Sequence, residues 1–124
     1  MSGYEVKIAN SSRELTAKEK IKIKDTSNAI RIDEATQEKN LIITPDYYVE
    51  LDVHNEKSDN VDYKVYVIVD KSGNKYVTGS ESFFTSFIDI YREMADEDEE
   101  YQIEIYRLES KNYKGKSFIT CSIV

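Results

Sequence analysis

The chain has 124 residues, of which 40% are hydrophobic and 33% are charged, and its net charge is −7. This length fits a single domain, and the hydrophobic fraction is enough for one modest core. The sequence has no apolar run of the kind that a membrane span or a signal peptide needs, and Cys121 is its one cysteine, which excludes an internal disulfide. We therefore expect a cytoplasmic protein that makes no membrane contact.

The charge is unevenly distributed along the chain. Residues 45–110 carry seventeen acidic and six basic side chains, a net charge of −11, whereas residues 111–124 carry three lysines and no acid. A global charge of this sign argues against polyanion binding over the whole surface, but it leaves room for a local basic groove.

Residues 1–44 are expected to form an N-terminal extension with short β segments. Tyr4–Ile8 alternates like a strand, and Lys20–Lys24 alternates strictly, which predicts a half-buried strand with its lysines on one face. Ile30 and Ile32 suggest a further short strand. The lysines would either extend a cationic groove or protect a sheet edge against aggregation, and we favour edge protection as the commoner use of such a pattern.

Stronger patterns follow Leu41. Alternating apolar residues predict five strands, at Tyr47–His54, Tyr63–Asp70, Lys75–Thr78, Tyr101–Tyr106 and Phe118–Val124. Gly73 in the connection between the second and third strands predicts a β-hairpin. Between the third and fourth strands, apolar residues at i, i+3 and i+4 spacing predict an amphipathic helix, and these are Phe84, Phe87, Ile88, Tyr91 and Met94.

This order predicts a mainly β fold with one helix. It matches a five-stranded barrel of the oligonucleotide/oligosaccharide-binding (OB) type over residues 45–124, with the helix between the third and fourth strands and the β extension of residues 1–44 packed on the barrel. Four residues of the helix should be buried against Val65, Val67 and Ile103, and these four are Phe84, Phe87, Ile88 and Tyr91.

The connection between the last two strands carries the first candidate site. It holds Lys111, Tyr113, Lys114 and Lys116, and Phe118 follows after Ser117. Lysines in such a loop neutralise phosphates, and aromatic rings stack on bases. An alternative of about equal weight is a lysine-rich loop kept soluble by its charge.

Outward residues of the predicted hairpin form a second candidate surface. Lys64 and Tyr66 share strand parity and therefore one face, while Lys75 and Tyr76 lie on the neighbouring strand. The alternative is that Tyr66 packs under the N-terminal extension, and Ile68 on the same face favours this coverage.

The sequence gives no catalytic, metal or cofactor signature. The acidic run Asp96–Glu100 is consecutive and lacks the glycine turn of a calcium loop, so a solvated helix end is the better interpretation. His54 is the one histidine, and neither it nor Cys121 has a partner at a recognisable spacing. We expect no enzyme activity, no metal and no cofactor.

Two segments carry a resemblance to a known family. Lys75–Phe84 (KYVTGSESFF) and Ser110–Lys116 (SKNYKGK) resemble small single-stranded-DNA-binding proteins of phages and mobile elements of Gram-positive bacteria. The resemblance covers roughly the last two-thirds of the chain and implies an OB barrel, a nucleic-acid ligand, a role in DNA replication and no catalysis. Many such proteins end in an acidic tail, whereas this chain ends in an apolar strand.

Two functions from different classes remain. The favoured one is non-catalytic binding of single-stranded nucleic acid with low sequence specificity. The alternative is an acidic phage-type inhibitor or DNA mimic, whose region Asp96–Glu100 would bind a nucleic-acid-processing protein. A structural subunit that assembles through an exposed strand edge, and hence a homo-oligomer, is a third interpretation.

Overall fold

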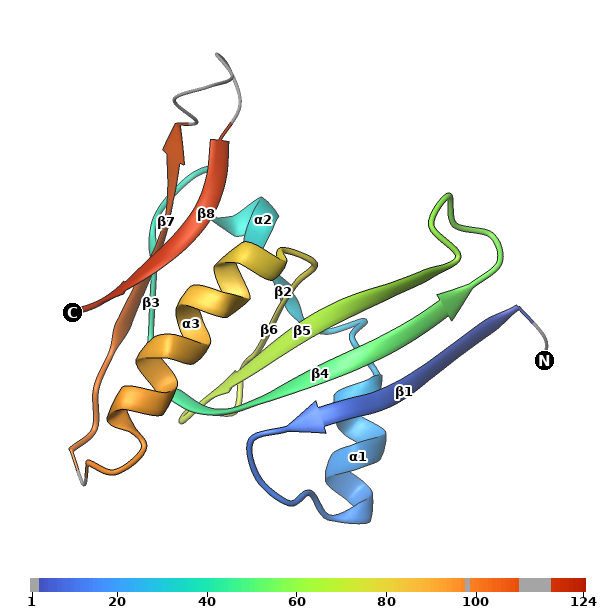
Figure 1. Cartoon of the computed structure of the whole chain (residues 1–124), viewed down its shortest axis with the longest axis horizontal. Coiled ribbons are helices and arrows are strands. Elements are labelled where there is room, and N and C mark those ends of the chain that lie inside the picture. Colours follow the sequence, from blue (N-terminus) through green and yellow to red (C-terminus); the bar gives the residue numbers. More distant parts are fainter. Residues whose placement is uncertain (1–2, 98, 110–116) are drawn as a thin grey trace.

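The computed structural model describes residues 3–97, 99–109 and 117–124. Of these residues, 45% lie in strands and 23% in helices, so the fold is mainly β, as predicted. The strands form two separate sheets, and a helix, α3, lies between the strands of one and the hairpin of the other (Figure 1).

The larger sheet has five strands in the order β1-β4-β5-β6-β2. Their bounds are Tyr4–Ser11 for β1, Pro45–Asn55 for β4, Asp62–Asp70 for β5, Lys75–Thr78 for β6 and Ile30–Arg31 for β2. The pairs are antiparallel except β2 with β6. Gly73 has a φ of 89° in the β5–β6 turn, a conformation that favours glycine, and this confirms the predicted hairpin.

The smaller sheet has the order β3-β7-β8 and is antiparallel throughout. Its strands are Leu41–Ile43 (β3), Ile103–Glu109 (β7) and Ser117–Ile123 (β8). A short helix, α2 (Ile32–Ala35), precedes β3 in the chain.

Helix α3 (Glu81–Met94) joins the two sheets through the main core. The Ser80 side chain accepts a hydrogen bond from the backbone of Phe83 and caps the helix, as the sequence predicts. Phe84 stacks on Tyr66 of the larger sheet at 4.3 Å between ring centroids. The smaller sheet contributes Ile43, Ile103, Ile105, Ile119 and Cys121 to the same cluster.

The opposite face of the larger sheet is covered as well. Val49, Leu51 and Val67 form a second cluster with Ile23 of α1 (Ala17–Lys24). Both faces of β5 are therefore buried. The prediction that α3 packs against Val65 and Val67 is wrong, because these two residues belong to the second cluster. Phe84 and Phe87 of α3 pack instead in the main core, with Tyr66, Ile68 and Ile103.

The predicted closed five-stranded barrel is not confirmed, because neither sheet closes on itself among the described residues. In a closed barrel, β4 would pair with β7. Here the free edge of β4 is taken by β1, and both edges of β7 are taken by β3 and β8. Strands from residues 1–44 thus occupy the edges that closure would use.

The predicted strand at Lys20–Lys24 is wrong, because these residues end helix α1. Thr16 caps the helix in a capping box with Glu19, a pairing that satisfies two backbone donors of the first turn. Hydrogen bonds from Arg13 and from the Thr16 backbone lower the pKa of Glu19 to about 2. On the helix, Ile23 is buried while Ile21 is 71% exposed, so the two isoleucines do not share a face.

Candidate nucleic-acid interface

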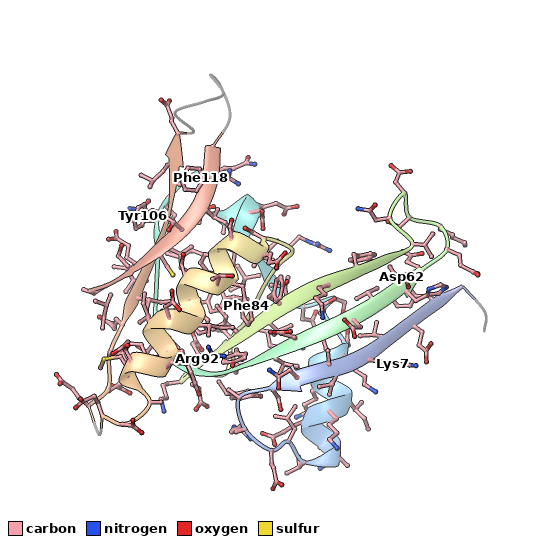
Figure 2. The ribbon with its side chains drawn as sticks, viewed as in Figure 1. Lys7, Asp62, Phe84, Arg92, Tyr106 and Phe118 are labelled. Atoms are coloured by element: carbon pink, nitrogen blue, oxygen red, sulfur yellow. The ribbon has the colours of Figure 1, made fainter. Side chains whose placement is uncertain are left out.

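The β7–β8 hairpin places one predicted site residue, Phe118, at the molecular surface (Figure 2). Phe118 is 44% exposed, and it pairs across the strands with Leu108, which is 45% exposed. Both lie near the end of the hairpin where Glu109 pairs with Ser117. Lys111, Tyr113, Lys114 and Lys116, which connect these two strands in the chain, lie outside the described residues.

The outer face of the smaller sheet carries little charge. Alternation along the strands directs Ile105, Ile119 and Cys121 into the core, so the residues between them face outward. The outward residues of β7 and β8 are Glu104, Tyr106, Leu108, Phe118, Thr120 and Ser122. The Tyr106 and Ser122 hydroxyls are hydrogen-bonded at 2.7 Å, which holds the tyrosine along this face.

Arg107 anchors the hairpin to the rest of the molecule. Its guanidinium donates to the backbone carbonyl of Asp33, to the Thr36 hydroxyl (3.2 Å) and to the Ser117 hydroxyl (2.9 Å). The Thr78 hydroxyl in turn donates to the Asp33 carboxylate at 2.6 Å, which links the hairpin to β6. No local sequence pattern marks Arg107, because its partners Asp33 and Thr36 are more than 70 residues away in the chain.

Lys64 lies far from the hairpin and among acids. Its ammonium group donates to the Asp52 carboxylate at 3.0 Å and lies 4.0 Å from Glu50, and the bond to Asp52 raises its pKa. Figure 2 shows Asp62, two residues before Lys64, on the right of the molecule and well apart from Phe118 at the upper left. The two predicted surfaces are therefore separate.

Tyr66 and Tyr76 are both buried. Tyr66 is 5% exposed, so its strand face is covered, but its ring stacks on Phe84 of helix α3 and not under the N-terminal extension as the alternative interpretation had it. The Tyr76 hydroxyl donates to the Asp70 carboxylate at 3.3 Å. Burial raises the pKa of both phenols, and neither ring presents a face to solvent.

Lys75 makes hydrogen bonds that tie β6 to the end of α1. Its ammonium group donates to the backbone carbonyls of Lys22 (2.8 Å) and Asp25 (2.6 Å). It borders an open cavity of about 560 Å³, which is also lined by Arg13 and Tyr47. The Arg13 guanidinium lies 3.9 Å from the centre of the Tyr47 ring and bonds Glu19, so the cavity's charges are largely matched internally.

The acidic run after α3 is exposed at four of its five positions, Asp96, Glu97, Glu99 and Glu100, and Asp98 lies outside the described residues. These four carboxylates form no ion pair with any described residue. In the part of the chain that the structure describes, no group of three or more His, Cys, Asp or Glu side chains is placed to hold a metal ion.

His54 and Cys121 belong to different sheets. The His54 Nδ1 lies 2.7 Å from Asp62, and its Nε2 lies 3.8 Å from Glu56. The hydrogen bond to Asp62 raises the pKa of the imidazole. Cys121 is buried, as predicted, and burial raises its pKa to about 11, so its thiol stays protonated at neutral pH.

Comparison of the chain with protein-family models, with curated proteins and with solved structures finds no match. Every described helix is too short or too polar to cross a membrane.

Proposed function

We propose that this protein binds single-stranded nucleic acid with low sequence specificity, and that it does so through the β7–β8 hairpin. The observation that carries the proposal is the exposed ring of Phe118, which follows the segment bearing Lys111, Lys114 and Lys116 in the chain. An aromatic ring stacks on any base, while lysines neutralise phosphates whatever the sequence.

The outer face of the smaller sheet supports this choice. Glu104 is the one charged residue among the outward residues of β7 and β8, so a polyanion meets little repulsion there. Tyr106 lies on the same face and adds a second aromatic side chain. Because the net charge of the chain is −7, nucleic acid can bind only at a surface region that lacks this negative charge.

The four site residues predicted on β5 and β6 are less suited to bind nucleic acid. Tyr66 and Tyr76 are buried, and Lys64 and Lys75 already have hydrogen-bond partners. We therefore assign the stacking and phosphate contacts to the hairpin. The order β4-β5-β6-α3-β7-β8 is the order expected for an OB barrel, and we propose that the fold is an opened variant of it.

The proposal is tested by fluorescence anisotropy with a labelled single-stranded oligonucleotide at low salt. The change Phe118→Ala should weaken binding by about 1–3 kcal/mol, the usual contribution of one stacked base. The matched control is Ile42→Ala, which removes a comparably exposed apolar side chain from β3 of the same sheet. If both variants bind as tightly as the wild type, the hairpin is not the interface.

One observation favours the alternative function. The exposed carboxylates of Asp96, Glu97, Glu99 and Glu100 gather between α3 and β7 and would suit a basic groove on a nucleic-acid-processing protein. Reversing the charge at Asp96, Asp98 and Glu100 should then abolish capture of a basic partner and leave oligonucleotide binding unaffected.

A further inference from the structure

We propose that two copies of this chain pair through the free edge of β8, in an antiparallel arrangement centred on Thr120. The proposal concerns association of the protein with itself and does not depend on nucleic-acid binding. It rests on a comparison of the four sheet edges, on the sequence of β8 and on the charge of the molecule.

Three of the four edges are short or protected. In the larger sheet, β1 carries Glu5 and Lys7 and its pairing is interrupted by an irregularity between Ile8 and Asn10, while β2 has two residues. In the smaller sheet, β3 has three residues. Charges, irregular pairing and shortness are three of the devices by which proteins prevent edge strands from pairing with other chains.

The fourth edge, β8, has none of these devices. The strand is seven residues long, carries no charge, proline or glycine, and pairs with β7 without a register shift. Among the described residues, no strand pairs with the edge of β8 that faces away from β7. Helix α3 packs against β8, and the inward residues Ile119 and Cys121 are buried in the main core. A regular edge of this kind offers backbone donors and acceptors to an added strand.

The sequence of β8 is complementary to itself when it is reversed. Antiparallel pairing about Thr120 sets Phe118 opposite Ser122 on the outer face and Ile119 opposite Cys121 on the inner face. Each large side chain then meets a smaller one, and each contact occurs twice. This is the requirement of a two-fold symmetric interface, in which the same patch serves both subunits.

Charge also favours a second copy at this edge. Two copies each carry −7, and they approach with least repulsion where the strand itself is uncharged. The joined sheets would have six strands, and the outer face with Phe118 and Tyr106 would stay open. Dimerisation should strengthen as salt is added, because salt screens the net repulsion.

The test is sedimentation of the full chain over a range of concentrations, without nucleic acid. We expect a monomer–dimer equilibrium in the wild type. Thr120→Lys should raise the dimer dissociation constant by about fivefold, because like charges directly opposite each other on antiparallel strands are destabilising. Thr120→Glu should act in the same way for the same reason.

Mixing the two variants separates edge pairing from misfolding. The lysine introduced into one copy would then face the glutamate introduced into the other, so the mixture should form a heterodimer at least as stable as the wild-type dimer. The control Ile42→Lys adds the same charge to the far edge of the same sheet and should leave dimerisation unchanged.

Three results would overturn the proposal: a wild type that is monomeric at every concentration, a mixture that fails to restore the dimer, or an Ile42→Lys variant that dissociates as readily as Thr120→Lys. The last result would indicate that the outer faces, and not the edges, meet.

Discussion

At the scale of single residues, charged side chains of the larger sheet are paired with each other where β4 ends and β5 begins. His54 contacts Asp62 and Glu56, and Lys64 contacts Asp52. An open groove of about 590 Å³ is lined by His54, Asp62, Lys64 and Asp52, so its walls carry both signs of charge. The pairs of His54 with Asp62 and of Lys64 with Asp52 join β4 to β5, and exposed pairs of this kind contribute little to stability individually.

His54 provides a residue-scale prediction, because it is the one histidine and its NMR signal is unambiguous. The hydrogen bond to Asp62 raises the pKa of the imidazole, so Asp62→Asn should lower it toward its ordinary value of 6.5. Glu56→Gln should lower it less, because Glu56 is more distant. An unchanged titration in Asp62→Asn would contradict the contact.

The raised pKa of His54 also determines the direction in which stability changes with pH. A group whose pKa is raised by folding contributes its full stabilisation at pH values below the pKa that it has in the unfolded chain. The contribution of His54 is therefore complete below pH 6.5 and is lost as pH rises through the raised pKa. Asp62→Asn should weaken this dependence of the unfolding free energy across that window, because Asp62 is the larger of the two contributions to the raised pKa.

At the scale of elements, helix α3 is the main connection between the sheets. Phe87 is fully buried and contacts Tyr48 edge-on at 6.0 Å between ring centroids. The change Phe87→Ala should therefore cost about 3–5 kcal/mol in denaturant unfolding. The control Asp89→Ala lies on the exposed face of the same helix and should change stability by less than about 0.5 kcal/mol. Equal effects of the two changes would show that the helix is placed wrongly.

Elements with a strong local pattern were predictable from sequence. Alternation located β4, β5 and β6, and the 3.6-residue spacing of Phe84, Phe87 and Tyr91 located α3. Lys20–Lys24 was not predictable by alternation, because the helix there is set by the capping box of Thr16 and Glu19. Local hydrogen bonds at a helix start outweigh a five-residue hydrophobic pattern.

Which element covers which face was harder to predict. Both faces of β5 are apolar, so alternation does not decide whether α3 meets Tyr66 or Val67. The burial of Tyr66 had a signal in Ile68, which shares its face, whereas the burial of Tyr76 had none. Pairing of β3 with β7 joins segments some sixty residues apart, and no local pattern encodes it.

At the scale of the whole molecule, charge separates two regions with different expected partners. The acids follow α3, while the outer face of the β7–β8 hairpin is nearly uncharged and adjoins the three lysines in the chain. Nucleic acid and a second copy of the chain should respond to salt in opposite ways. Counterion release weakens nucleic-acid binding as salt rises, whereas screening strengthens association of like-charged copies.

The most direct measurement is the salt dependence of binding to a labelled single-stranded oligonucleotide. The logarithm of the binding constant should fall linearly with the logarithm of salt concentration, with a slope of about −0.7 per neutralised phosphate and hence about −2 for three lysines. The triple change Lys111→Ala, Lys114→Ala and Lys116→Ala should bring the slope close to zero, while Phe118→Ala should weaken binding with little change in slope. Folded wild-type protein that binds no single strand even at low salt, or a triple variant with an unchanged slope, would contradict the proposed function.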